Sequence, residues 1–384
     1  MSRDTAGAAE AARRGDWPEV LAQLSSVETA ATGVADDFAL LASAHMHAGS
    51  PEAAEAAADR ALQLDAANLR AALVKADLLY AREALKEANL FYRAVAETRA
   101  VLADLPPDLA EGVGRARALR DRLARDIFSH VQAELGRAGY VEGRSSSRFT
   151  HALDLATGKR QAYFQQPQAF YFPELPNTQF YPREQFPWLD AIEAETETIT
   201  AELEAVLRTD ETFAPYIRSI PGLPNQADYP LIDSTDWSAC FLWKDGRETP
   251  IADRCPRTMA ALEAAPLCRI AGRSPQIMFS QLKAGAHIRP HYGFVNTRLI
   301  CHLPLIVPPG CRFRVGNEVR SWEKGKAWVF DDTIEHEAIN QSDRTRVVLI
   351  FDIWRPELTG EERALVQTLL EAMDAFSPSR TDWG

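Results

Sequence analysis

The sequence contains no apolar run that approaches the roughly 18 residues needed to cross a bilayer, so we expect no membrane-spanning helix. Its first residues, MSRDTAGAAEAARRGDW, lack the apolar stretch of a signal peptide. Positive charge is also in deficit, because 42 lysines and arginines face 54 aspartates and glutamates, for a formal net charge of −12. This balance argues against nucleic acid or an anionic membrane surface as the main partner.

Cysteine is scarce, and its positions follow no metal-finger spacing. The five cysteines are Cys240, Cys255, Cys268, Cys301 and Cys311. An odd number of scattered cysteines favours reduced thiols and a cytoplasmic location, although a Cys255–Cys268 disulfide stays open as an alternative. The chain is 384 residues long, 46% hydrophobic and 25% charged, which suits a globular protein with room for two domains.

The first 137 residues are rich in alanine and lack strand alternation, which predicts helices. A short pattern recurs inside them: GDWPE at 15–19 returns as GSPE at 49–52, a spacing of 33 to 34 residues. The second copy continues as AEAAADRALQLDAAN. This period and ending resemble tetratricopeptide repeats, which are stacked helix pairs. A third unit, roughly 84–102, has lost the glycine and proline signals, and a longer helix is expected from Leu109 to Leu135.

Two roles for the repeats stay open: a groove that holds a peptide beside an active site, or a scaffold for packing or dimerisation. After them, GRAGYVEGRSSS at 136–147 has the composition of a linker. The next segment, QAYFQQPQAFYFPELPNTQFYPREQFPWL, is aromatic and proline-rich, so we expect it to wrap a domain; an exposed aromatic peptide site is the alternative. Helices are expected at 190–207, at 258–265 and from a Thr359–Glu362 capping box to Phe376, with a strand at 237–246.

Between these helices, short apolar runs broken by turn residues predict a compact antiparallel β domain. The expected strands are Ile277–Leu282, Leu299–Val307, Cys311–Val315, Ala327–Phe330 and Val347–Trp354. Polar groups interrupt this apolar framework. Strand alternation places Arg346 on one face with Val348, Ile350 and Asp352, so its guanidinium needs an anion inside the domain. His302 lies within the run ICHLPLIV, and His291 and His336 lie in turn-like segments beside the strands. Two such imidazoles can hold a divalent metal, but spacing alone leaves ordinary core histidines as an equal alternative.

The motifs PHYGFVNTRLICHLPL and WEKGKAWVFDDTIEHEA, then Arg346 and FDIWRPELT, resemble the aspartyl/asparaginyl β-hydroxylase family of iron(II)- and 2-oxoglutarate-dependent oxygenases. The resemblance extends from about Trp237 to Leu358. It implies an α+β chain: a tetratricopeptide-like helical solenoid at 1–138, a linker at 139–160, and an oxygenase domain at 161–384. That domain would be a double-stranded β-helix, which is a cupin-like jelly roll, with flanking helices.

The resemblance also implies roles for single residues. His291 and His336 would be the two iron ligands, with Gly293 in the position where most such oxygenases carry a carboxylate. Arg346 would grip the distal carboxylate of 2-oxoglutarate by two parallel hydrogen bonds, a task unsuited to lysine. The hydroxyl of Ser280 would share that carboxylate, and His302 would lie near the end that chelates the metal.

One position departs from the family, which often has a second arginine where this chain has Ile300. Arg298, two residues earlier and on the same face, is the candidate to compensate for it in binding. Asp331 and Asp332 are open to two interpretations: orientation of His336 and contact with metal-bound water, or capping of a strand-end turn. We favour the turn for Asp331.

Three functions follow as hypotheses. The first is hydroxylation of an aspartyl or asparaginyl side chain, at Cβ, in a peptide or protein held by the helical repeats, with consumption of O2 and release of succinate and CO2. The second is the same chemistry on a small molecule or a lipid-linked acyl chain. The third is a non-catalytic scaffold. The repeats favour the first hypothesis, and the intact set of His291, His336 and Arg346 disfavours the third.

Overall fold

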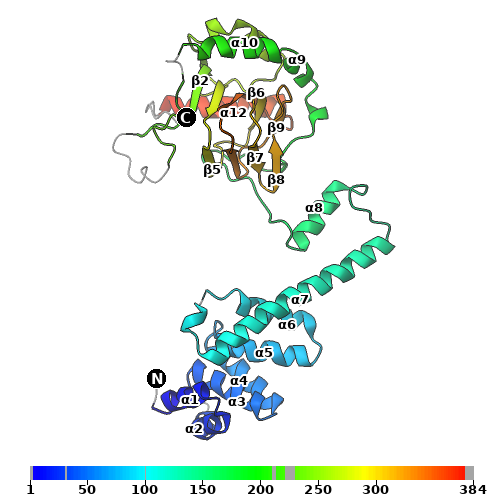
Figure 1. The fold of residues 1–384 in the computed structure, drawn as a ribbon, viewed down its shortest axis with the longest axis vertical. Coiled ribbons are helices and arrows are strands. Elements are labelled where there is room, and N and C mark those ends of the chain that lie inside the picture. Colours follow the sequence, from blue (N-terminus) through cyan, green and yellow to red (C-terminus); the bar gives the residue numbers. More distant parts are fainter. Residues whose placement is uncertain (1–2, 31–32, 100, 210–212, 221–229, 377–384) are drawn as a thin grey trace. The chain divides into compact units, whose positions relative to one another are not determined.

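The computed structural model describes residues 3–30, 33–99, 101–209, 213–220 and 230–376 (Figure 1). The chain divides into two compact units, residues 1–159 and 160–384. In the described part of the chain, no helix combines the length and the apolar character that a bilayer crossing requires.

The first unit is helical, as the alanine-rich composition predicts. Its helices are α1 (Arg3–Arg13), α2 (Trp17–Ala30), α3 (Ala35–His47), α4 (Pro51–Leu64), α5 (Leu69–Ala81), α6 (Leu85–Ala96), the 3-10 turn η1 (Leu102–Asp104), α7 (Pro107–Arg137) and α8 (Ser147–Ala156). Successive helices pack on one another around buried alanines such as Ala42 and Ala58, whose small side chains allow close approach. The expected helix at 109–135 is α7. The expected linker contains α8, so it is not irregular throughout.

The 34-residue period reappears in the backbone. Gly15 (φ 74°), Gly49 (φ 72°) and Glu83 (φ 61°) all adopt the left-handed conformation, and each lies between two consecutive helices. Glycine adopts this conformation without steric cost, whereas a glutamate does not. The repeated turn therefore persists in the third unit, where the glycine signal has been lost. The tetratricopeptide assignment itself stays a prediction.

The second unit is built on two antiparallel sheets. Its strands are β1 (Ala214–Pro215), β2 (Trp237–Lys244), β3 (Arg247–Glu248), β4 (Ile277–Leu282), β5 (His287–His291), β6 (Arg298–Ile306), β7 (Cys311–Val315), β8 (Glu318–Ser321), β9 (Trp328–Phe330), β10 (His336–Asn340) and β11 (Arg346–Trp354). The larger sheet has the order β1-β2-β4-β11-β6-β9, with β3 paired to β2, and the smaller has the order β5-β10-β7-β8. The four-strand sets β4-β11-β6-β9 and β5-β10-β7-β8 together form an eight-stranded jelly roll. The predicted β domain is confirmed.

The five strands predicted in this domain agree with the structure to within one residue at either end. The sequence-based interpretation missed β5, β8 and β10, so His291 and His336 lie in strands rather than in turns. The sequence of β5, HIRPH, contains a proline and three polar residues and lacks an apolar face long enough to indicate a strand. Its pairing with β10 stabilises an extended conformation that its own residues favour only weakly.

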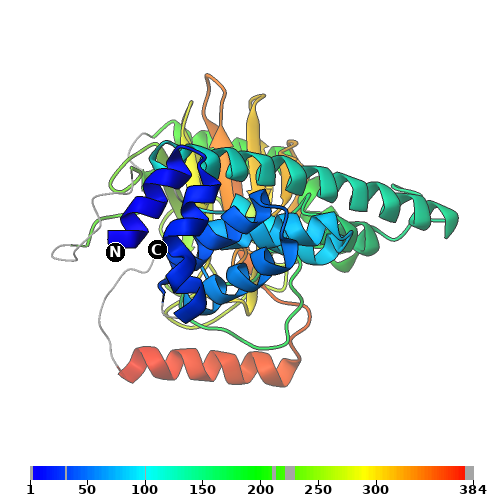
Figure 2. The ribbon, with the colours of Figure 1, turned by 90° about the horizontal axis from the view of Figure 1, so that it is seen from below.

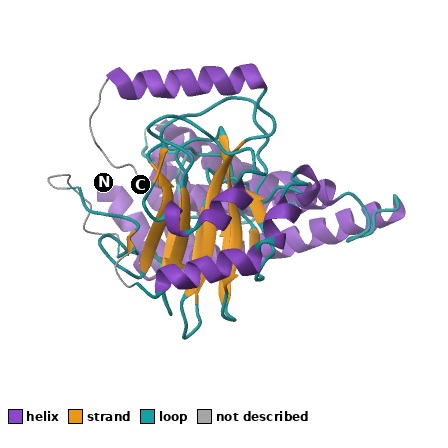
Figure 3. Cartoon of the chain, turned by 90° about the horizontal axis from the view of Figure 1, so that it is seen from above, coloured by secondary structure: helices purple, strands orange, loops and turns teal. Residues whose placement is uncertain are grey.

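Helices cover the outer face of the larger sheet (Figures 1 and 3). They are α9 (Leu189–Ala194), α10 (Thr196–Leu207) and α11 (Pro256–Leu262), with short 3-10 turns at Arg183–Gln185 and Ala252–Arg254. Ile199 and Leu203 of α10 join a core with odd-numbered residues of β6 and β11, such as Leu303 and Leu349. The even-numbered residues of these strands are thereby left to face the other sheet. The single helix expected at 190–207 is in fact two helices, α9 and α10.

The proline-rich segment wraps this unit, as predicted. Between residues 160 and 182 it forms only isolated bridges, which pair Phe170 with Val295 and Phe180 with Phe330. The last helix, α12 (Gly360–Phe376), runs across the direction of the strands (Figures 2 and 3). Thr359 and Glu362 make the reciprocal hydrogen bonds of the predicted capping box. All five cysteines are buried, and Cys255 and Cys268 do not form a disulfide.

Candidate active site

A cavity of about 870 Å³ is lined by residues of both sheets of the jelly roll. The larger sheet contributes alternate residues of neighbouring strands, because side chains in a strand point to opposite faces in turn. These are Trp237, Ala239 and Phe241 of β2, Met278 and Ser280 of β4, Arg298, Ile300 and His302 of β6, and Arg346 and Ile350 of β11. The smaller sheet contributes His291, His336, Ile288, Phe313 and Ala338. The predicted site residues therefore meet in one cavity.

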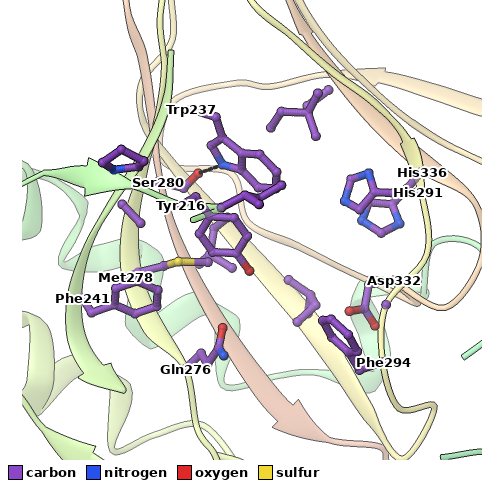
Figure 4. Close-up of a pocket in the computed structure, with 18 of the residues that line it drawn as sticks. Tyr216, Trp237, Phe241, Gln276, Met278, Ser280, His291, Phe294, Asp332 and His336 are labelled. Carbon is purple, nitrogen blue, oxygen red and sulfur yellow. Dashed lines mark hydrogen bonds between the residues drawn. The ribbon is translucent and has the colours of Figure 1, made fainter. Parts of the chain in front are cut away.

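His291 and His336 are direct partners in the pairing of β5 with β10, and their ring centroids lie 4.0 Å apart (Figure 4). Each Nδ1 is hydrogen-bonded to a backbone carbonyl two residues earlier: His291 to Arg289 at 2.8 Å and His336 to Ile334 at 3.1 Å. A carbonyl only accepts, so both Nδ1 atoms carry the proton. Each Nε2 therefore keeps its lone pair, which is the tautomer that a metal ligand needs.

Both imidazoles are held in the neutral form. Burial lowers the pKa of His336 well below its ordinary value, and the neighbouring His291 ring lowers it further. Burial also lowers the pKa of His291. Neutral imidazoles can bind a divalent cation, whereas protonated ones cannot. Among the described residues, no third His, Cys, Asp or Glu completes a set of three around this pair.

Asp332 occupies the space beside Gly293. A Cβ placed on Gly293 would lie 2.1 Å from Oδ2 of Asp332, so the carboxylate already fills the volume that a side chain at 293 would need. The backbone N–H of Gly293 donates to the carbonyl of Asp332 at 2.7 Å. Oδ1 of Asp332 is buried and has no hydrogen-bond partner among the described residues. A polar atom in that state is suited to bind water or a ligand.

At another part of the cavity lies a buried cation without a counter-ion. Arg346 is 1% exposed, and no described carboxylate forms an ion pair with it. Nη1 of Arg346 donates to the backbone carbonyl of Ser280 at 3.3 Å, its Nε has no partner, and its guanidinium lies over the Trp322 ring at 4.6 Å. Burial lowers the pKa of Arg346 to about 10, but the group stays protonated at neutral pH. An uncompensated buried guanidinium is an anion receptor.

Two predicted neighbours of Arg346 complete this end of the cavity. The hydroxyl of Ser280 accepts a hydrogen bond from Nε1 of Trp237 at 3.3 Å, which leaves its own proton free to donate (Figure 4). His302 is 4% exposed, and its Nδ1 has no partner within the described part of the chain. Burial and the positive charge of Arg346 lower the pKa of His302 well below its ordinary value, so this imidazole is also neutral.

Arg298 is held between two carboxylates. Its Nη2 lies 3.2 Å from Oδ2 of Asp332, and its Nε lies 3.6 Å from Oδ2 of Asp352. Burial disfavours the charge of Arg298, but the two aspartates together raise its pKa. Burial raises the pKa of each aspartate to about 6, against the opposing effect of Arg298. Arg298, the candidate to compensate for the arginine missing at Ile300, therefore already has two counter-ions.

Asp331 anchors the site instead of lining it. Arg355 and Asp331 form an ion pair of 3.0 Å in which both side chains are fully buried. Asp331 also accepts from Thr333 and from Gln165 of the wrapping segment. Nη1 of Arg355 donates to the carbonyl of Asn296 at 2.9 Å. This pair therefore connects the strand-end loops that follow His291 and precede His336.

Three features in or beside the cavity were not predicted. Trp322 lies against the Arg346 guanidinium, Asp352 is a counter-ion of Arg298, and Tyr216 stacks on Trp237 at 4.3 Å with its hydroxyl directed into the cavity (Figure 4). Asp352 was detectable in principle, since it is a charged residue on the same strand face as Arg346. Tyr216 lies in a segment without helical or strand periodicity, so the sequence did not indicate its place in the site.

Comparison with known proteins identifies the relatives of this unit. Residues 193–356 match the family described as aspartyl/asparaginyl beta-hydroxylase. The aspartyl/asparaginyl beta-hydroxylase of Mus musculus is 41% identical over 145 residues, which are 37% of this chain and 19% of that protein. The aspartate beta-hydroxylase domain-containing protein 2 of Homo sapiens is 31% identical over 221 residues, 56% of each chain. The ornithine lipid ester-linked acyl 2-hydroxylase of Rhizobium tropici is 37% identical over 190 residues, 48% of this chain and 63% of that protein.

The matched region contains both histidines, Arg346 and the whole jelly roll. The family resemblance predicted from the sequence motifs is confirmed for this region. The chain spans less than two thirds of the length of each of these relatives.

Proposed function

We propose, from the match of residues 193–356 to the aspartyl/asparaginyl beta-hydroxylase family, that the chain is an iron(II)- and 2-oxoglutarate-dependent oxygenase. The names of its relatives support hydroxylation as the class of reaction. One observation carries the proposal: a single cavity contains two imidazoles with free Nε2 atoms and a buried guanidinium that has no counter-ion among the described residues. The first pair suits a divalent metal and the second group suits a carboxylate.

The donor set fits the expected groups. His291 and His336 would hold iron(II) through Nε2, since the backbone carbonyls already fix each Nδ1 proton. Arg346 and the Ser280 hydroxyl would hold the distal carboxylate of 2-oxoglutarate, and His302 would lie beside the end nearer the metal. When bound, the metal and cosubstrate supply the oxygen chemistry, in which O2 is consumed, succinate and CO2 are released and a C–H bond is hydroxylated.

The protein's own contribution is positioning and the exclusion of water. Phe313, Phe330 and Ile288 line the cavity around the histidines and keep its interior apolar. In a dry site, the charge-assisted bonds from Arg346 to a carboxylate are stronger than they would be in water. Asp332, whose Oδ1 is unpartnered, would accept a hydrogen bond from water or from the acceptor beside the histidine pair.

The acceptor has two candidates. An aspartyl or asparaginyl side chain in a peptide or protein, hydroxylated at Cβ, is the first, and the helical repeats would hold the rest of that chain. A lipid-linked acyl chain or a small molecule is the second. The specific observation that favours the second is Ile300, an apolar residue in the cavity where the family often has an arginine.

The first test is turnover of the cosubstrate. Purified protein with iron(II), 2-oxoglutarate and O2 should form succinate, and a chelator should abolish that formation. A peptide-library screen, read by mass spectrometry as the gain of one oxygen atom, then separates the peptide from the acyl alternative. A protein that binds iron yet forms no succinate with any acceptor would refute the proposal and favour a scaffold.

A further inference from the structure

We infer that the acceptor part of this cavity rejects carboxylates and takes an uncharged, aliphatic reacting group, and that Ile300, Asp332 and Asp352 determine this specificity. The inference rests on the proposed function and deepens it by naming the acceptor class. Of the candidates above, an acyl chain meets both conditions, an asparaginyl side chain is uncharged but not aliphatic, and an aspartyl side chain meets neither.

The position of Ile300 follows from the register of the larger sheet. On β6, Ile300 lies between Arg298 and His302, and across the sheet it pairs with Asp352 while His302 pairs with Ile350. Arg346 is at the opposite end of β11 from Asp352. With 2-oxoglutarate held at Arg346, the cavity that remains for an acceptor extends along the sheet towards Ile300.

Among the described residues, Arg298 is the one cation in that part of the cavity, and two carboxylates already neutralise it. Side chains of Asp332 and Asp352 are 9% and 2% exposed, and both lie against Arg298 at 3.2 and 3.6 Å. Asp352 also accepts from the backbone N–H of Gln276 at 2.6 Å, which fixes its carboxylate. One positive and two negative groups give the cluster no net positive charge. An acceptor carboxylate would add a further negative charge in a region of low dielectric, where repulsion is strong.

The surrounding residues are apolar. Met278 pairs with both Phe241 and Ile350 across neighbouring strands, so these three side chains form one row on the face that Ile300 shares. Phe294 lines the cavity from the loop after His291. A group that is desolvated against such a surface gains free energy if it is made of methylenes and loses it if it is an unpaired anion.

Two further cations line the cavity among the described residues, and both are in contact with solvent. Arg218 is exposed, and Lys244 is half-buried with its ammonium 5.1 Å from the Phe241 ring centroid. Among the described residues, Asp332 and Asp352 form ion pairs with Arg298 and with neither of these two residues. These two residues therefore do not change the sign of the charge at Ile300.

The test compares two ligands that differ in charge but not in length, heptanamide and heptanoate. Full-length protein with manganese(II) and saturating 2-oxoglutarate, kept free of O2, is titrated with each, and binding is followed by the fluorescence of the tryptophans, among them Trp237 in the cavity. Saturating 2-oxoglutarate blocks Arg346, so heptanoate cannot bind there. We expect heptanamide to bind about tenfold more tightly or better, because specificity of this kind arises from repulsion of the wrong ligand.

Two variants and one control make the result specific. Ile300→Arg adds an unpaired cation and should reverse the preference. Asp352→Asn removes one of the two negative charges beside Arg298 and should bring the affinities for heptanamide and heptanoate together. This second variant keeps the test decisive if Ile300→Arg folds poorly. Val319→Arg adds the same charge at an exposed position of β8 and should leave the preference unchanged. Heptanoate binding as tight as heptanamide in the natural protein, or no binding of heptanamide, would overturn the inference.

The succinate assay is independent of this measurement. A protein that forms succinate but prefers heptanoate would refute the specificity and leave the proposed function intact. A protein that prefers heptanamide but forms no succinate would support the specificity and refute the proposed function.

Discussion

His291 and His336 face each other across the pairing of β5 with β10, with their ring centroids 4.0 Å apart and each Nδ1 on a backbone carbonyl. Backbone carbonyls therefore fix the tautomer of both rings. No further side chain of the metal-binding types joins them in the described part of the chain. A metal at this site would depend on both rings.

We expect His291→Ala or His336→Ala to abolish metal binding and succinate formation while the fold stays largely intact. Either change leaves a single protein ligand, and one imidazole holds a divalent ion weakly. Equilibrium dialysis with iron(II), succinate assays and circular dichroism measure the three effects. His287→Ala is the matched control, since it removes an exposed imidazole from the same strand. Unchanged succinate output in either variant would remove these residues from the site.

Arg346→Lys should raise the Michaelis constant for 2-oxoglutarate far more than it changes stability. A guanidinium makes two parallel bonds to a carboxylate and an ammonium does not, so we expect a loss of about 1.5–3 kcal/mol, roughly a ten- to hundredfold rise. Arg344→Lys, two residues earlier and exposed, should change nothing. Steady-state kinetics measure the Michaelis constants. Equal constants for the natural protein and Arg346→Lys would show that the carboxylate of 2-oxoglutarate is held elsewhere.

The buried pair of Arg355 and Asp331 should be necessary for stability. Arg355→Met leaves the Asp331 carboxylate buried without its counter-ion and frees the carbonyl of Asn296, which should cost about 3–5 kcal/mol. Urea unfolding measures this cost, with Arg344→Met as the exposed control. Adding Asp331→Asn to the variant should restore part of the loss, because it removes the unpaired charge. A variant as stable as the natural protein would show that water replaces the arginine.

The close approach of Gly293 and Asp332 should make a larger residue at position 293 destabilising. Gly293→Ala places a methyl 2.1 Å from Oδ2 of Asp332, so the carboxylate must move away from Arg298, at a cost of about 1–3 kcal/mol. Asp332→Ala in the same chain should relieve most of that cost, and a double-mutant cycle measures the coupling. Gly114→Ala in α7 is the control, because no atom lies near its added methyl. Additive effects would mean that the two residues are independent.

How far the sequence predicted the site depended on the kind of signal. Strand alternation correctly placed Arg346, Val348, Ile350 and Asp352 on one face, because a period of two leaves a clear pattern in an apolar strand. The same rule failed for β5 and β10, where polar residues outnumber apolar ones and pairing between distant segments determines the structure. Both histidines were therefore identified as candidates but assigned to turns.

Long-range partners were the part that sequence could not supply. The two carboxylates on Arg298 come from positions 332 and 352, and only the pairing of β6 with β11 and β9 in the larger sheet brings them to one guanidinium. The expectation that Arg298 compensates for the arginine missing at position 300 took account of the charge of Arg298 but not of the two aspartates that neutralise it. Similarly, the interpretation of Asp331 as a turn residue agrees with its hydrogen bond from Thr333 but did not predict its ion pair with Arg355.

The helical unit should determine which acceptor is used and not whether the chemistry occurs. Residues 1–159 form a compact unit of their own, and every described residue that lines the cavity belongs to the second unit. Helical repeats stack into an elongated surface suited to an extended chain. We therefore expect a chain of residues 160–384 to convert 2-oxoglutarate to succinate at the rate of the full chain. For the peptide candidate of the proposed function, tested with an uncharged asparaginyl acceptor, hydroxylation of a long peptide should fall at least several-fold. Light scattering establishes that the shortened chain is soluble, and a short peptide serves as the matched substrate. If long and short peptides are hydroxylated equally well by both chains, the repeats are a scaffold.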